Sequence, residues 1–107
     1  MTSDALQVEL LYFEGCPSYQ TAARLLREAL IEECMSPAIE AIRIESEADA
    51  QQLKFVGSPT IRIDGNDPFL SGEANYGLEC RLFTTPEGLK GWPTKDMLRE
   101  ALRSSLR

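Results

Sequence analysis

The chain has 107 residues, a formal net charge of −6 and no histidine. This length fits one domain, residues 1–107, with a single core. The acidic balance argues against nucleic acid or an anionic membrane surface as a partner. The lack of histidine excludes imidazole general bases and histidine-containing metal sites.

The first half of the chain alternates between predicted strands and helices. An apolar run over 6–13 predicts a strand, and apolar residues at helical spacing predict a helix over 17–33. A second strand is predicted over 39–44. A short helix is predicted within 45–55, with Ser46 as its N-cap.

The second half begins with a short alternating strand over 60–63. A polar loop is predicted over 66–77, a half-buried strand over 78–83 and a loop over 84–93. A last amphipathic helix is predicted over 94–106.

These elements predict an α/β fold of the order β-α-β-α-β-β-α. The first two strands should be parallel, because a helix connects them by a crossover. The last two strands should be antiparallel, because only a loop joins them. The expected architecture is a four-stranded mixed sheet flanked by helices on both faces.

Cys16 stands where the first predicted strand gives way to the first predicted helix. The first amides of a helix lack partners and carry partial positive charge, so they favour a thiolate, which is the reactive form of cysteine. Pro17 suits the first helical position, since it has no amide hydrogen. We therefore predict that Cys16 is a nucleophile and that Pro17 contacts its substrate.

The element order, the Cys16-Pro17 step and the Ser58-Pro59-Thr60 step into the third strand together resemble the thioredoxin-like superfamily. The closest resemblance is to glutaredoxin-sized members, over residues 6–63 and 78–106. The resemblance implies that the bond before Pro59 is cis and that this proline packs against Cys16, although cis X-Pro bonds are only about 5–6% of such bonds.

The chain is also similar to a group of small bacterial thioredoxin-like proteins of undefined role. The similarity includes Asp67-Pro68-Phe69 in the polar loop and Cys80-Arg81-Leu82 in the fourth predicted strand. This second resemblance implies no particular activity.

Two positions depart from the dithiol members of the superfamily. Tyr19 stands where those proteins carry a second cysteine, so a Cys-x-x-Cys disulfide cannot form. Leu10 stands where thioredoxins carry a buried aspartate. The resemblance therefore implies a monothiol oxidoreductase or thiol-transfer protein, in which an external thiol resolves a mixed disulfide on Cys16.

The resemblance also implies roles for the neighbours of Cys16. The amides of Ser18 and Tyr19 would stabilise the thiolate, and Ser58 with Pro59 would hold an extended substrate chain. The expected partners are a protein disulfide or a small thiol such as glutathione, which would act as co-substrate. No bound cofactor or metal is expected.

Cys80 has two interpretations. It alternates with leucines, which favours a core position, because free cysteine is often buried. Antiparallel pairing should bring Phe83 or Thr84 beside Pro59, leaving Cys80 on the order of 10 Å from the site, beyond the ~7 Å reach of a disulfide. A Cys16–Cys80 dithiol oxidoreductase is therefore the weaker alternative, with Cys80 as resolving thiol.

A competing hypothesis from another class is a non-catalytic binding module for a protein partner or a thiophilic metal ion. Loss of the second cysteine of the Cys-x-x-Cys motif favours it. The three cysteines, Cys16, Cys34 and Cys80, are scattered along the chain. We find neither a secretory leader nor an apolar run of membrane length, so a cytoplasmic protein with free thiols is expected.

Overall fold

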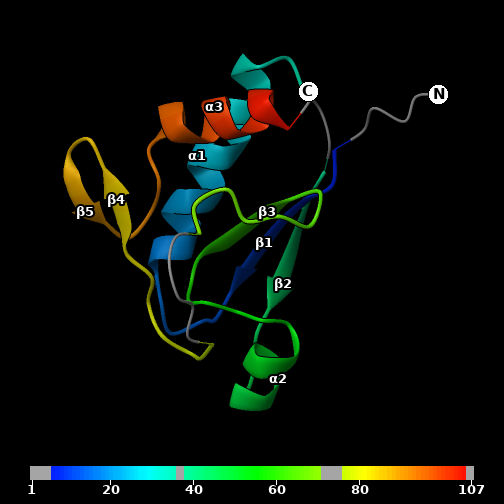
Figure 1. Ribbon diagram of the computed structural model, residues 1–107, viewed down its shortest axis with the longest axis vertical. Helices are drawn as coiled ribbons and strands as arrows, with labels where there is room; N and C mark the ends of the chain where they lie inside the picture. Colours follow the sequence, from blue (N-terminus) through cyan, green and yellow to red (C-terminus); the bar gives the residue numbers. More distant parts are fainter. Residues whose placement is uncertain (1–5, 36–37, 71–75, 106–107) are drawn as a thin grey trace.

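The computed structural model describes residues 6–35, 38–70 and 76–105 and is shown in Figure 1. Its helices and strands, in chain order, are β1 (Val8–Tyr12), α1 (Ser18–Glu32), β2 (Ile39–Arg43), α2 (Glu47–Gln52), β3 (Thr60–Ile63), β4 (Phe83–Thr85), β5 (Gly88–Lys90) and α3 (Lys95–Ser104). The α/β class predicted from the sequence is confirmed. No helix among these is both long enough and apolar enough to cross a membrane.

Three strands form a mixed sheet in the order β2-β1-β3. β1 runs parallel to β2, as the crossover through α1 predicts, and antiparallel to β3. In the central strand, Leu10 lies opposite Ala41 on one side and Ile61 on the other. β1 is therefore the central strand of the sheet, and the chain leads from its carboxyl end to Cys16.

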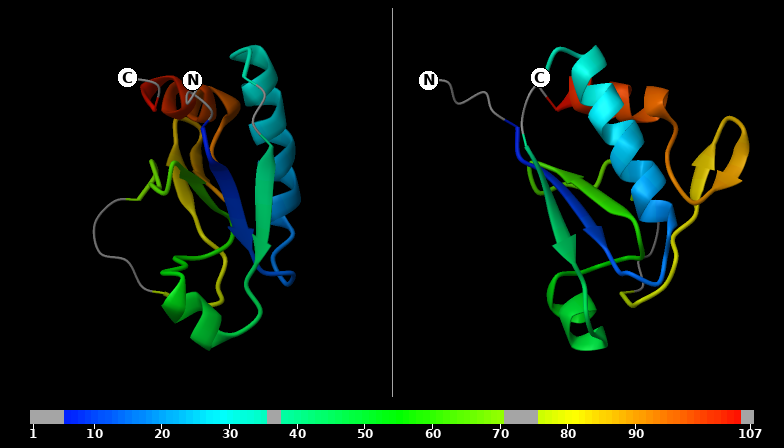
Figure 2. Two further views of the ribbon diagram at one scale, coloured as in Figure 1. Left: turned by 90° about the vertical axis from the view of Figure 1, so that its right-hand side faces the viewer. Right: turned by 180° about the vertical axis from the view of Figure 1, so that it is seen from behind.

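Leu10 and Leu11 are neighbours on β1, so their side chains point to opposite faces of the sheet, and each belongs to a different core cluster. Figure 2 shows α1 along one face, with α3 packed beside it. The core on that side contains these buried residues: Leu6, Val8, Leu10, Leu26, Ala29, Leu30, Ile61, Ile63, Leu98, Ala101 and Leu102. A smaller cluster on the other side joins Leu11 to Ile44, Ala50 of α2 and Phe55.

The predicted fourth strand over 78–83 is not found in the described part of the chain. Its contact with the β3 region is a single bridge between Ser58 and Cys80, and that bridge is parallel. The predicted antiparallel pairing is therefore wrong. After β3 the chain is long enough to come back to Ser58, which lies just before β3. Pro59 cannot extend the pairing between Ser58 and Cys80, because it has no amide hydrogen.

The predicted loop over 84–93 contains a hairpin instead, formed by β4 and β5 (Figure 1). Its turn is stabilised by Thr85, whose hydroxyl donates to the carbonyl of Gly88 at 2.6 Å and accepts from the amide of Glu87 at 3.1 Å. Gly88 has a φ of 105°, which a side chain would strain. These hydrogen bonds of Thr85 form the turn. They do not appear in the alternation of polar and apolar residues from which strands are predicted.

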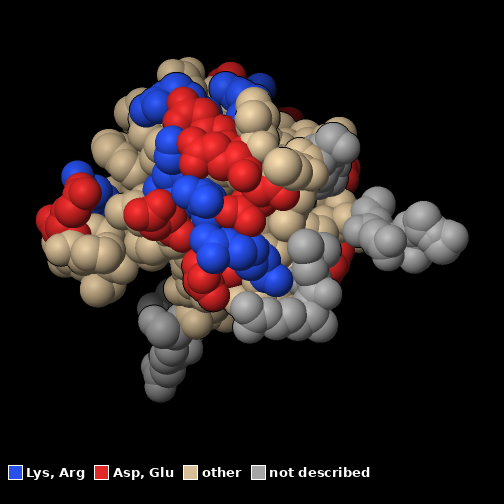
Figure 3. Space-filling view, turned by 90° about the horizontal axis from the view of Figure 1, so that it is seen from above, with Lys and Arg blue, Asp and Glu red and all other residues tan. Residues whose placement is uncertain are grey.

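A ladder of ion pairs joins the last turn of α1 to α3. Lys95 Nζ lies 2.6 Å from Glu32, and Arg99 Nε and Arg103 Nε lie 2.7 and 3.2 Å from Glu33. Figure 3 shows acidic and basic side chains interleaved over this end of the molecule. The ladder anchors the end of α1 that lies opposite Cys16.

Candidate functional site

Cys16 lies in the turn between β1 and α1, as predicted. Its amide donates to the carbonyl of Phe13 at 3.2 Å, which closes the turn, and its side chain is fully buried. α1 begins two residues later, at Ser18, and Pro17 is the residue before its first turn. The local sequence therefore places a thiol at the start of a 15-residue helix.

The peptide bond between Ser58 and Pro59 is cis, the geometry expected from the sequence. The carbonyl oxygen of Ser58 lies 3.5 Å from the sulfur of Cys16. Both residues of this dipeptide are buried. The step into β3 thus lies directly against the turn that carries Cys16.

The prediction that Cys80 lies about 10 Å from the site is wrong. Its Sγ is 2.9 Å from Sγ of Cys16. The cause is the parallel bridge: the amide of Ser58 donates to the carbonyl of Glu79 at 2.8 Å, and the amide of Arg81 donates to the carbonyl of Ser58 at 2.9 Å. Pairing at Ser58, rather than farther along β3, brings Cys80 beside Cys16.

A buried ion pair holds the segment that carries Cys80. Arg81 donates to both carboxylate oxygens of Asp67, at 2.7 and 3.3 Å, and the two side chains are only 9% and 7% exposed. The Arg81 guanidinium also lies 4.4 Å from the ring centroid of Phe83, which meets Phe69 edge to face. Asp67 and Arg81 belong to two short motifs that are separate in the sequence, and only the fold brings them together.

Gly57 provides the close approach that this arrangement requires. Its φ is 121°, and a Cβ added to it would lie 3.1 Å from both Cβ of Arg81 and the carbonyl oxygen of Glu79. A side chain here would therefore meet the backbone of the segment that presents Cys80.

The electrostatics of the two sulfurs differ. Burial raises the pKa of the Cys16 thiol. Hydrogen bonding from Cys80 and from the backbone and hydroxyl of Ser18, together with the nearby Ser58 hydroxyl, lowers this pKa by more, so the net shift is downward. The hydrogen bond that Cys80 donates to Cys16, followed by burial and the charge on Cys16, raises the pKa of Cys80. The pair therefore favours a Cys16 thiolate that accepts a hydrogen bond from the Cys80 thiol.

The hydroxyl of Ser58 strengthens this interpretation. It is buried and has no hydrogen-bond partner among the described residues. A buried donor without a partner is costly, and an adjacent thiolate would satisfy it.

A pH titration is expected to separate the two sulfurs. In a Cys34→Ser background, one thiolate should form at a pH below the pKa range of an ordinary cysteine and the second at a pH above it. Ultraviolet absorbance of the thiolates follows both steps.

The Cys80→Ala variant should raise the pKa of Cys16, because burial remains while the hydrogen bond is lost. Because the folded-state pKa of Cys16 is lowered, its stabilisation is present above the unfolded pKa and is lost as pH falls through the folded one. Titration of both sulfurs together, as two ordinary thiols, would contradict the assignment.

The remaining predicted site residues lie around this pair. Tyr19 stacks on Tyr12, with ring centroids 4.2 Å apart, so its ring has a packing role. Pro17 is exposed and lies beside the site. The backbone of Ser58, predicted to hold a substrate chain, is already bonded to residues 79–81 of this protein. Cys34 is exposed at the opposite end of α1 and is not part of the site.

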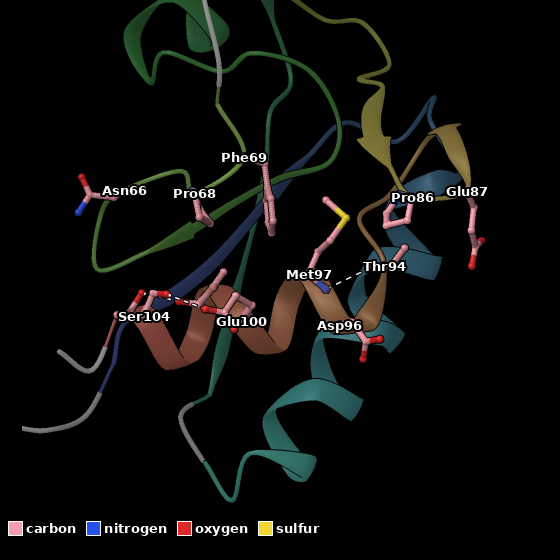
Figure 4. A pocket seen from close by; sticks show the side chains of 12 residues that line it. Asn66, Pro68, Phe69, Pro86, Glu87, Thr94, Asp96, Met97, Glu100 and Ser104 are labelled. Atoms are coloured by element: carbon pink, nitrogen blue, oxygen red, sulfur yellow. Dashed lines mark hydrogen bonds between the residues drawn. The ribbon is translucent and has the colours of Figure 1, made fainter.

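A pocket lined by described residues lies elsewhere. It has a volume of about 930 Å³ and lies between α3, the 66–69 segment and the hairpin turn. Figure 4 shows Phe69 and Met97 projecting toward this space, which includes neither Cys16 nor Cys80. The reactive groups therefore lie outside it.

No family model matches this chain, and a comparison with curated proteins finds no match. Within residues 6–35, 38–70 and 76–105, no cluster of three or more cysteine or carboxylate side chains is arranged to hold a metal ion.

Proposed function

We propose that this protein is a thiol–disulfide oxidoreductase of the thioredoxin-like type, with Cys16 and Cys80 as its redox couple. The observation that carries the proposal is the 2.9 Å distance between their sulfurs. This geometry supports the dithiol alternative better than the monothiol one, because a second thiol is already placed to resolve a mixed disulfide.

Disulfide formation requires only a small movement. A disulfide has an S–S bond of about 2.05 Å, so the two sulfurs need to approach by about 0.9 Å. In the reaction, both sulfurs lose their protons and together give two electrons to a substrate disulfide, which leaves as two thiols. The reverse reaction oxidises a substrate dithiol.

The same distance between the two sulfurs disfavours a metal ion shared by Cys16 and Cys80. Two thiolates on a tetrahedral Zn²⁺, each with a Zn–S bond of about 2.3 Å, would lie roughly 3.8 Å apart. The observed 2.9 Å is shorter, so ion binding would require the two sulfurs to separate. Metal binding by this pair therefore has less support than the redox couple.

Two further observations support the thioredoxin-like relationship. The cis Ser58–Pro59 bond lies against the cysteine that precedes α1. The elements β1 to β3 follow the expected β-α-β-α-β order. We propose that the protein acts on protein or small-molecule disulfides, and the cytoplasm is the compartment expected from the sequence.

Oxidation of the wild-type protein by glutathione disulfide tests the proposal. Trypsin cleavage places Cys16, Cys34 and Cys80 in separate peptides, 1–24, 28–43 and 63–81. We expect the first and last of these to be disulfide-linked, while Cys34 carries only a glutathione adduct. Peptide mass mapping without reductant reads both results.

The Cys16→Ser and Cys80→Ser variants are the matched controls. Each should lose the cross-link and keep a stable glutathione adduct on its remaining site cysteine or on Cys34. If oxidised wild-type protein instead carries a stable adduct on Cys16 and no cross-link, the dithiol proposal is wrong and the monothiol mechanism holds.

A further inference from the structure

We propose that Cys80, rather than Cys16, exchanges disulfides with the external substrate, and that Cys16 is the buried partner that resolves the mixed disulfide. This inference rests on the proposed function. It reverses the roles that the sequence assigns, in which the cysteine at the helix start meets the substrate.

The first argument is access. Cys16 has no exposed surface, whereas Cys80 is exposed. Thiol–disulfide exchange requires one sulfur to reach another, so its rate depends on access as well as on thiolate content. In this fold Cys80 is the more accessible cysteine of the pair.

The second argument is the backbone around Ser58. The segment 79–81 occupies both the amide and the carbonyl of Ser58. An extended substrate chain would have to displace this segment to pair there and reach Cys16. Exchange at Cys80 leaves the pairing, and therefore the position of Cys80, unchanged.

The third argument is the leaving group. In the Cys16–Cys80 disulfide, an incoming thiolate that attacks Sγ of Cys80 expels the Cys16 thiolate. A leaving thiol with a lower pKa departs faster. Hydrogen bonding from the backbone and hydroxyl of Ser18 favours the Cys16 thiolate as the leaving group.

Substrate reduction then follows in balanced steps. The Cys16 thiolate takes the proton of Cys80, and the Cys80 thiolate attacks a substrate disulfide R–S–S–R. This gives Cys80–S–S–R and R–S⁻. The R–S⁻ group then takes the proton from Cys16, which becomes a thiolate again. The Cys16 thiolate then attacks Sγ of Cys80, forming the Cys16–Cys80 disulfide and releasing the second R–S⁻.

The test is to locate the mixed disulfide. Oxidised Cys34→Ser protein is mixed with glutathione, quenched with acid at short times and alkylated with N-ethylmaleimide before tryptic mapping. Acid stops exchange because it protonates the thiolate. We expect glutathione on peptide 63–81 and maleimide on peptide 1–24.

The reaction rates of two variants test the same assignment of roles. With an aromatic disulfide as probe, Cys80 in Cys16→Ser should react about as fast as exposed Cys34. Cys16 in Cys80→Ser should react at least about tenfold more slowly, because it is buried. Glutathione mainly on Cys16, or equally on both cysteines, would overturn the assignment of roles.

Failure of the inference is distinguishable from failure of the proposed function. If the Cys16–Cys80 disulfide cannot be prepared, the proposed function fails. If it forms and glutathione is then found on Cys16, only the assignment of roles fails.

Discussion

Replacing Asp67 by asparagine is expected to lower the free energy of unfolding by about 3–5 kcal/mol, the usual cost of removing one partner of a buried ion pair. The Asp67 and Arg81 side chains are 7% and 9% exposed, so the remaining guanidinium would be buried without a counter-charge. For a domain of this size, the midpoint of thermal unfolding should fall by more than about 10 °C. Urea denaturation followed by circular dichroism measures the change.

The matched control is Arg24→Gln, which removes the exposed pair between Arg24 and Glu28. Such pairs contribute at most about 0.5 kcal/mol. Replacing Asp67 and Arg81 together by apolar residues should recover much of the lost stability, since no buried charge then remains. If Asp67→Asn costs no more than Arg24→Gln, the ion pair does not stabilise the fold.

Gly57→Ala is expected to destabilise the protein and to slow formation of the Cys16–Cys80 disulfide. A φ of 121° costs a side-chain-bearing residue about 1–3 kcal/mol on its own. The added Cβ would also lie 3.1 Å from the carbonyl oxygen of Glu79, so the segment next to Cys80 would have to move. Urea denaturation measures the first effect, and the rate of oxidation by glutathione disulfide measures the second.

Gly65→Ala separates these two causes. Gly65 has a φ of 83°, and a Cβ there meets no atom within 4 Å. It should therefore show the backbone cost without slowing disulfide formation. Equal oxidation rates for the two alanine variants would show that contact with the Glu79–Arg81 segment does not position Cys80.

Local signals in the sequence predicted the position of Cys16, because an apolar run that ends before a Cys-Pro step indicates a strand-to-helix turn. The cis bond before Pro59 was expected from the resemblance to the thioredoxin-like superfamily. The parallel pairing of β1 and β2 followed from the helix between them. None of these predictions required the register of the chain after β3.

The position of Cys80 depended on long-range pairing. The alternation of leucines around it predicted a strand, and the register was then assigned as if the chain turned back along β3. In the structure, a single bridge to Ser58 and the ion pair between Arg81 and Asp67 set the position. The available signal was the presence of Asp67 in one short motif and Arg81 in another. A sequence alone does not show that these two side chains form an ion pair.

The separation of the two site cysteines along the chain has a consequence for the folded state as a whole. They are 64 positions apart, so a bond between them would close a large loop and restrict the unfolded chain. In the chain-entropy account, such a loop stabilises the folded state by about 4 kcal/mol. Oxidation and reduction at this site would therefore also set how often the whole domain opens, and with it the susceptibility of the protein to proteolysis.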